Sequence, residues 1–234
     1  MGIMKKEKIN IQFVIFLFTI VLLLLVYRSP VFADTYTQRN FCVTDSNSPL
    51  YGKNVRLFYD SDGCLVQDTQ NIIGNRSNYE IFVNKRTNVV TIYAVDKGVY
   101  IPVKRFVCSN GGGNTPEGNF YTPNKYRWHE LMGPSWGQWC EHLTDDILFH
   151  SVYYNKERDN KSLSVSAYNK LGTMASHGCV RLTAGDAKWI YDNCKIGTKV
   201  IIYNNKKNPG PFDKPKAQKL SSSHTWDPTD PTIK

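Results

Sequence analysis

The residues of this sequence with the clearest capacity for chemistry are a cysteine in a short polar segment and a histidine upstream of it. Residues 176–179 read Ser-His-Gly-Cys, and His150 follows an apolar run at residues 147–149. A cysteine attacks a carbonyl as its thiolate, so an acyl-transfer site needs a base or positive field and backbone N–H donors for the oxyanion. The cysteine segment offers both, and we predict nucleophilic chemistry at Cys179.

The backbone around the cysteine is expected to provide the oxyanion donors. Gly178 has no side chain to hinder an approaching carbonyl, and the amides of Gly178 and Cys179 are placed where a nucleophile's own turn commonly forms an oxyanion hole. A helix is expected to begin at Thr183. Its N-terminus would add modest stabilisation of the thiolate if the turn points Cys179 toward it.

The string SHGCVRL at residues 176–182 resembles the active-site motif of the L,D-transpeptidase catalytic domain, also called the YkuD-type domain, in which a distant His precedes a Ser/Thr-His-Gly-Cys core. The similarity extends less specifically over residues 79–203 and includes a Thr-Pro-Glu-Gly element at residues 115–118. The resemblance implies a mainly β fold, an L,D-transpeptidase-like sandwich or barrel with one short helix after the cysteine motif. It also implies a cysteine acyl-enzyme and a peptidoglycan substrate.

The resemblance also implies roles for individual residues. Cys179 matches the nucleophile, His150 the imidazole that pairs with it, and Ser151 the residue whose main-chain carbonyl orients that imidazole. Ser176 and His177 match residues that contact the substrate or support the nucleophile turn.

Two features depart from the usual family pattern. Residues 151–175 make a longer gap between the two motif elements, and we expect an inserted hairpin there with its turn near residues 155–161. Arg181 stands where the motif most often has Asn, and its planar fork could hold a substrate carboxylate.

The same residue types also occur in disulfides, as structural histidines and as metal ligands. An exported cysteine is usually half of a disulfide, and His150 could be a buried structural histidine. His129, Cys140 and His142 match no zinc-ligand spacing, so we expect neither a metal nor another cofactor. If Cys179 is catalytic, at most two disulfides can form among the five other cysteines, with their connectivity open.

Residues 1–33 have the three parts of a secretion signal, namely a lysine-containing start, an apolar stretch at residues 13–27 and the cleavage pattern Val-Phe-Ala. Cleavage after Ala33 is favoured over retention as a membrane anchor, because the apolar stretch is short for a spanning helix. The predicted location is therefore the cell wall, on the outer side of the membrane. Removing four basic and one acidic residue changes the net charge of +9 to +9 − (4 − 1) = +6. This charge suits an anionic wall polymer or membrane surface better than nucleic acid, although solubility alone could account for it.

The remaining chain divides into three predicted parts. Residues 34–78 are turn-rich, with a hairpin formed by residues 55–59, an Asp-Gly turn and residues 64–66. This piece weakly resembles one unit of the aromatic hairpin repeats of wall-binding modules, and a hairpin docked on the main domain is the alternative. Residues 79–203 form the predicted catalytic domain, and residues 204–234 a tail containing Pro, Lys and Ser.

Hydrophobic alternation predicts strands at residues 79–84, 89–95, 100–108 and 199–203. Residues 126–143 combine Trp, His and Tyr with Gly-Pro, which predicts an ordered loop or lid that either borders a substrate groove or packs over the sheet. A helix is expected from the N-cap Thr183, with Asp186 completing a capping box, to Gly197.

The predicted function is that of a monomeric peptidoglycan L,D-transpeptidase that forms 3–3 cross-links from tetrapeptide stems. The alternatives are an L,D-carboxypeptidase, in which water is the acceptor, and a non-catalytic wall-binding protein. A sortase-like or papain-like enzyme is a further rival, but the Thr-Leu-x-Thr strand end of sortases is absent from the sequence.

Overall fold

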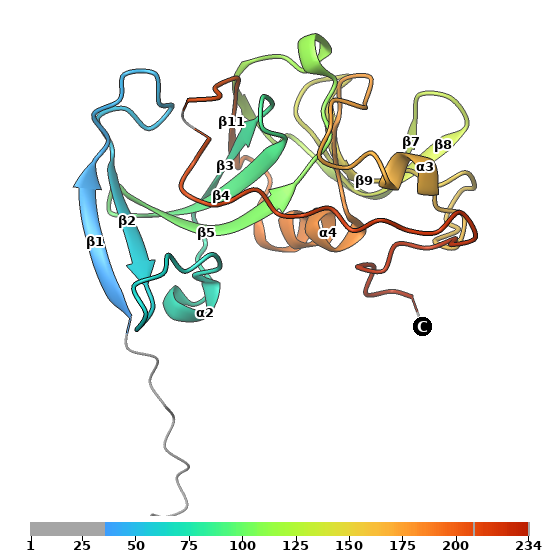
Figure 1. Cartoon of the computed structure of the whole chain (residues 1–234). Helices are drawn as coiled ribbons and strands as arrows, with labels where there is room; N and C mark the ends of the chain where they lie inside the picture. Colours follow the sequence, from blue (N-terminus) through green and yellow to red (C-terminus); the bar gives the residue numbers. More distant parts are fainter. Residues whose placement is uncertain (1–35, 208, 234) are drawn as a thin grey trace, which may run out of the picture. The chain divides into compact units, whose positions relative to one another are not determined.

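Strands form most of the regular structure in this computed structural model, which describes residues 36–207 and 209–233 (Figure 1). The predicted signal segment lies outside the described residues. The larger sheet has the strand order β1-β2-β5-β4-β3-β11-β6 and the smaller one the order β10-β9-β8-β7. Both belong to one compact unit, Thr37–Lys234. The mainly β fold predicted from the sequence is confirmed.

The strands of the larger sheet are β1 (Thr37–Cys42), β2 (Asn54–Tyr59), β3 (Tyr79–Asn84), β4 (Val89–Asp96), β5 (Val99–Val107), β6 (Gly118–Tyr121) and β11 (Lys199–Tyr203). The four strands predicted from alternation correspond to β3, β4, β5 and β11. Side chains of β3 and β4 are buried on both faces of the sheet, including Ile81, Phe82 and Ile92. This two-sided burial explains why these segments are rich in Val, Ile, Tyr and Phe.

The N-terminal segment adds two strands to the larger sheet. β2 pairs with β5 in parallel and with β1 in antiparallel orientation. The predicted Asp-Gly turn forms, with the Gly63 amide donating to the Asp60 carbonyl at 3.0 Å. Where a second hairpin strand was expected at residues 64–66, the structure has a single bridge between Tyr59 and Leu65. β2 pairs with β1 and β5 instead. It thereby becomes part of a larger sheet with a hydrophobic face, which is more stable than an isolated hairpin.

The smaller sheet contains a β-hairpin where an irregular loop was predicted. Its strands are β7 (Lys125–Leu131), β8 (Ser135–His142), β9 (Leu148–Ser151) and β10 (Val180–Leu182). The prediction of a loop at residues 126–143 was therefore wrong. β7 and β8 are antiparallel, with the pairing interrupted at Trp139, whose φ is 53°, and only residues 132–134 form the turn between them. Gly133, with φ of 75°, permits that turn.

The helices are short, as expected. The longest in the described ranges is α4 (Ala184–Asn193), whose N-cap Thr183 accepts a hydrogen bond from the Asp186 amide at 3.1 Å, as predicted. Sequence patterns did not indicate the single-turn helices α2 (Gln70–Ile73) and α3 (Val165–Tyr168) or the 3-10 turn η1 (Gly112–Asn114). Trp189 of α4 packs against Tyr79 and Phe106, so α4 covers one face of the larger sheet.

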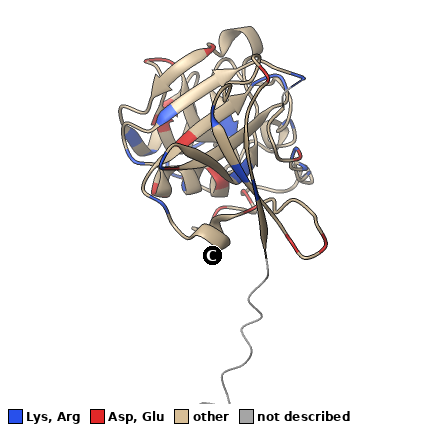
Figure 2. Cartoon of the chain, turned by 90° about the vertical axis from the view of Figure 1, so that its left-hand side faces the viewer, with Lys and Arg blue, Asp and Glu red and all other residues tan. Residues whose placement is uncertain are grey.

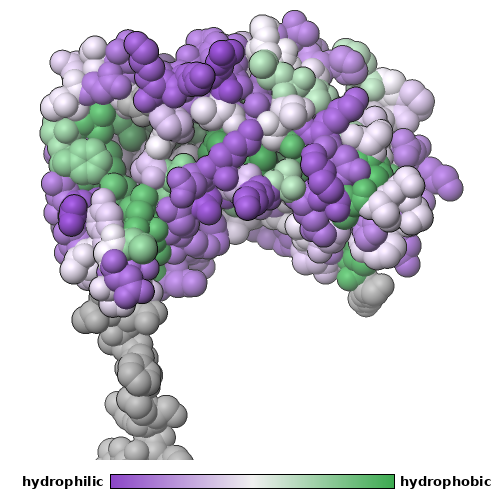
Figure 3. All heavy atoms as spheres, viewed as in Figure 1, coloured by the Kyte–Doolittle hydropathy of each residue, from purple (hydrophilic) through white to green (hydrophobic). Residues whose placement is uncertain are grey.

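All six cysteines are free thiols, with Cys108, Cys140 and Cys194 buried and Cys42 and Cys64 exposed. The two disulfides allowed by the sequence are therefore not formed. Polar residues cover most of the face shown in Figure 3. Basic and acidic residues are interspersed in the view of Figure 2. Within the described ranges, no helix has both the length and the apolar character needed to cross a bilayer.

Candidate active site

Parallel pairing of β9 with β10 brings the two motif elements together. His150 is the register partner of Arg181, and Phe149 that of Val180, so Cys179 precedes β10 directly beside the histidine strand. The long gap forms a turn, in which the Asn155 amide donates to the Ser162 carbonyl at 2.9 Å, followed by α3. The predicted turn near residues 155–161 is confirmed, but the expected hairpin is reduced to one antiparallel bridge between Tyr154 and Leu163, and both ends of the insertion remain in register.

His150 is held as a neutral, oriented imidazole. It is 2% exposed, and its Nδ1 lies 2.5 Å from the Ser151 main-chain carbonyl. Because a carbonyl only accepts, Nδ1 carries the proton and Nε2 is left as the acceptor. Burial, and then the positive charge of Arg181, lower the pKa of His150 to about 3. The histidine is therefore unprotonated at neutral pH and able to act as a base.

Cys179 is partly buried, and its thiol is not hydrogen-bonded to His150. Burial raises the pKa of the Cys179 thiol, while a backbone amide at Leu148 and the charge of Arg181 oppose this rise. Its Sγ donates to the Asp146 carbonyl at 3.7 Å. The resting pair is a neutral thiol beside a neutral imidazole, so the proton must move when the sulfur attacks.

Hydrogen bonds within the nucleophile turn fix its shape. Ser176 Oγ donates to the Cys179 carbonyl at 2.6 Å and accepts from the Gly178 amide at 3.2 Å. Thr115 Oγ1 donates to the Gly178 carbonyl at 2.6 Å. Two amides were predicted to bind the oxyanion. The Gly178 amide already donates to Ser176 Oγ, whereas the Cys179 amide has no oxygen acceptor within the described ranges.

The glycine-rich loop before residue 115 supports the nucleophile turn from below. A Cβ on Gly111 would lie 2.5 Å from the Gly178 nitrogen, and one on Gly178 would lie 2.5 Å from Ile147 Cδ1. The Thr-Pro-Glu-Gly element was noted from the sequence, but the role of the glycines that precede it was missed. The signal available was the run of three glycines at residues 111–113, one residue before the Thr-Pro-Glu-Gly element, since close backbone approach favours glycine.

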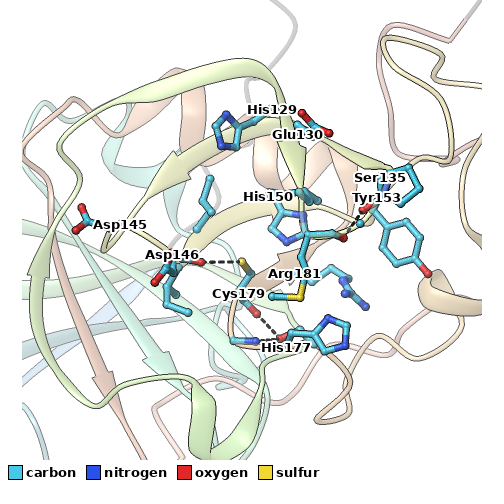
Figure 4. Close-up of a pocket in the computed structure, with 18 of the residues that line it drawn as sticks. His129, Glu130, Ser135, Asp145, Asp146, His150, Tyr153, His177, Cys179 and Arg181 are labelled. Atoms are coloured by element: carbon cyan, nitrogen blue, oxygen red, sulfur yellow. Dashed lines mark hydrogen bonds between the residues drawn. The ribbon is translucent and has the colours of Figure 1, made fainter.

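A cavity of about 820 Å³ opens over the cysteine. Figure 4 shows Cys179 lying between Asp146 on one side and Arg181 on the other, with His150 above it. Of the predicted site residues, all but Ser151 line the cavity, and Ser151 contacts His150 through its main-chain carbonyl. The lining comprises residues 129–135, 145–148, 176–179, His150, Tyr153, Asn155 and Arg181.

The β7–β8 hairpin both borders the cavity and packs against the fold. Its tip at residues 131–135 lines the cavity. Farther along the same hairpin, Trp128 contacts Tyr154 and Trp139 contacts Tyr191, with ring centroids 5.3 Å apart in each pair. The tip of the hairpin therefore borders the cavity, as one prediction had it, and the rest of the hairpin packs against the fold, as the other had it.

The N-terminus of α4, which was expected to stabilise the Cys179 thiolate, binds the C-terminal tail instead. The Ala184 amide donates to Asp227 Oδ2 at 2.7 Å, and the Gly185 amide to Thr229 Oγ1 at 2.9 Å. The first amides of α4 thus bind the C-terminal tail.

Potential metal ligands do not gather around the site. The rings of His129 and His142 lie 5.2 Å apart, beside the cavity. Across the described part of the chain, no group of three or more His, Cys, Asp or Glu side chains is arranged to hold a metal ion.

Arg181 is a candidate carboxylate anchor. Its NH1 donates to the Ala175 carbonyl at 3.0 Å, its guanidinium lies 5.1 Å from the Tyr153 ring centroid, and its Nε is buried without a partner in the described structure. A buried guanidinium with an unused donor is suited to a planar anion such as a carboxylate.

We expect Arg181→Gln to shift the acid limb of Cys179 acylation to higher pH. Removing the positive charge makes the His150 imidazolium less unfavourable, which raises the pKa of His150 from its value of about 3. Loss of the same charge raises the pKa of Cys179 further, so the plateau rate also falls. Intact-mass measurement of carbapenem acylation across pH tests both effects. Arg181→Lys keeps the charge and should leave the acid limb in place. Coincident acid limbs for the wild type and Arg181→Gln would contradict the assignment.

Comparisons with known proteins identify a family match. The model of the L,D-transpeptidase catalytic domain, YkuD, matches residues 78–202. YciB of Bacillus subtilis (strain 168), a candidate L,D-transpeptidase, is 45% identical over 94 residues, which are 38% of this chain and 46% of YciB. The alignment thus spans about half the length of that relative.

Solved L,D-transpeptidases show partial structural likeness. The enzyme from Stackebrandtia nassauensis is 19% identical over 58% of this chain and 59% of its own, with a TM-score of 0.41. The enzyme from Mycobacterium smegmatis is 17% identical over 63% and 66% of the two chains, with a TM-score of 0.42. Because the family model spans more than half of the sequence and includes the complete cysteine motif, this chain belongs to the L,D-transpeptidase catalytic domain family.

Proposed function

We propose that this protein is a peptidoglycan L,D-transpeptidase that forms 3–3 cross-links from tetrapeptide stems through an acyl-enzyme on Cys179. The observation that carries the proposal is the neutral His150, oriented by the Ser151 carbonyl and sharing one cavity with Cys179 and Arg181. An oriented base beside a thiol, with an anion-binding guanidinium close by, suits acyl transfer from a peptide that ends in a carboxylate.

In the first half-reaction the thiol turns from the Asp146 carbonyl toward His150. Nε2 takes its proton as the sulfur attacks the carbonyl carbon of the third stem residue, and the Cys179 amide stabilises the oxyanion. The tetrahedral adduct collapses, and His150 returns the proton to the nitrogen of the departing D-alanine. A thioester on Cys179 remains.

In the second half-reaction the side-chain amine of the third residue of a neighbouring stem attacks the thioester. His150 accepts a proton from the amine, the C–S bond breaks, and the proton returns to the sulfur. Arg181 and His177 are assigned to substrate contact. Ser176 is assigned to support of the turn, because both of its hydrogen bonds lie within it.

Product analysis distinguishes cross-linking from hydrolysis. Purified protein incubated with disaccharide-tetrapeptide should yield a cross-linked dimer with loss of one D-alanine, detected by mass spectrometry. Tripeptide product alone would identify an L,D-carboxypeptidase. If no D-alanine is released while the protein still binds purified wall, the non-catalytic alternative is favoured.

The exported location and the cleaved signal are part of the same proposal. N-terminal sequencing of the protein recovered from outside the cell should begin at Asp34, and recovery of an intact Met1 form in the membrane would contradict cleavage. For residues 34–78 we propose a structural role, supported by the pairing of β2 with β5.

A further inference from the structure

The C-terminal tail ends in two consecutive Asp-Pro-Thr units, residues 227–229 and 230–232. In the first unit, Asp227 Oδ1 accepts from the Thr229 amide at 2.8 Å and from Thr229 Oγ1 at 2.7 Å. In the second, Asp230 Oδ1 accepts from the Thr232 amide at 2.9 Å and from Thr232 Oγ1 at 2.7 Å. In each unit the aspartate therefore uses Oδ1 for hydrogen bonds within the unit, and its Oδ2 binds a residue outside the unit.

The first unit attaches the tail to α4. Asp227 is fully buried, and its Oδ2 accepts from the Ala184 amide at 2.7 Å. A Cβ on Gly185 would lie 2.7 Å from the Thr229 carbonyl oxygen, so the first turn of α4 is shaped for close approach of the tail. The tail can be followed along α4 in Figure 1.

The second unit reaches the strand next to the catalytic histidine. Gln138 of β8 donates from Nε2 to Asp230 Oδ2 at 2.8 Å, and both side chains are buried. The main-chain amide of Gln138 donates to Ser151 Oγ at 2.9 Å. Ser151 supplies the carbonyl that holds His150 Nδ1. Gln138 therefore connects the tail to the residue that orients His150.

We propose that Asp230 and Gln138 are positioning residues for His150, acting through Ser151. The inference rests on the proposed role of His150 as the base. No residue of the described tail lines the cavity, so the tail acts through β8 and not through the substrate. Without the Asp230 carboxylate, Gln138 loses a buried charge-assisted partner, β8 gains freedom to shift, and the hydrogen bond from His150 to Ser151 lengthens.

The test compares Asp230→Ala with Asp227→Asn in the full chain. Both weaken the tail, but only Asp230→Ala removes the acceptor of Gln138. We expect Asp230→Ala to slow carbapenem acylation of Cys179 by about 10- to 100-fold. Asp227→Asn should lower the melting temperature and keep the wild-type rate. The double variant Gln138→Glu/Asp230→Asn reverses donor and acceptor and should recover most of the rate. If Asp230→Ala does not fold, Gln138→Met keeps the side-chain volume and should show the same loss.

A spectroscopic signal makes the test independent of activity. In protein labelled with ¹⁵N-histidine, the His150 Nδ1 proton should give a downfield, slowly exchanging resonance. That resonance should weaken or move in Asp230→Ala and persist in Asp227→Asn. If the wild type shows the resonance but is never acylated, the proposed function is wrong, while the positioning role of Asp230 is not contradicted. Equal rate losses in the two variants, or an unchanged rate and resonance in Asp230→Ala, would overturn the positioning role.

Discussion

Cys179→Ala is expected to abolish acyl-enzyme formation with both a defined stem peptide and a carbapenem. Cys179 is the cysteine that lines the cavity with His150, and removal of the nucleophile in other hydrolytic triads costs on the order of 10⁶-fold in rate. Intact-mass spectrometry of the protein after incubation measures the effect. The expected spectrum is that of the unmodified polypeptide.

A matched control is available because two other thiols are more exposed. Cys42 and Cys64 lie at the surface, whereas Cys179 is partly buried. Cys64→Ala should therefore be acylated like the wild type. If simple thiol exposure governed reactivity, the exposed Cys42 and Cys64 would be acylated and Cys179→Ala would keep its adduct, which would refute the nucleophile assignment.

His150→Gln is expected to slow acylation by about 10²- to 10⁴-fold at neutral pH. Burial raises the pKa of the Cys179 thiol, so few thiolates exist at neutral pH unless a base takes the proton. As the pH rises toward that raised pKa, the thiolate forms without help. The rate deficit of His150→Gln should therefore narrow with increasing pH.

Acylation rates of wild type and variant from pH 6 to 10 test this expectation. His224→Gln serves as the control, because the His224 ring contacts Trp226 in the tail, with ring centroids 3.9 Å apart, and does not line the cavity. A deficit that stays constant over this pH range would show that His150 acts in some way other than deprotonation of the thiol.

The sequence predicted the parts of the molecule whose local pattern carries the structural signal. β3 and β11 have the predicted bounds, because both segments are rich in Val, Ile, Phe and Tyr, which favour strands whatever their partners. Cys179 and His150 were found from a motif that depends on residue type. The strands β7 and β8 were missed because their burial shows no simple alternation, with no residue of β7 buried and five successive residues of β8 buried.

Contacts between segments that are distant in the chain could not be predicted from the sequence. The bond from Thr115 to the Gly178 carbonyl joins residues that no local pattern connects. The sequence predicted only a tail containing Pro, Lys and Ser at residues 204–234, because this segment has no hydrophobic period. Its attachment instead depends on the buried carboxylates of Asp227 and Asp230, which bind backbone and side-chain donors.

The position of β11 in the larger sheet has a consequence for the order of folding. β11 lies between β3 and β6, and β6 has no other strand partner in the described sheets. A nascent chain that has not yet reached residue 199 therefore leaves β6 unpaired and the edge of β3 open. Pairings between distant segments form slowly, and open edges favour aggregation. The loop that leads into β6 is held by Lys85 Nζ, which donates to the Gly112 and Thr115 carbonyls, so β6 itself is the part of this region whose pairing waits for residue 199.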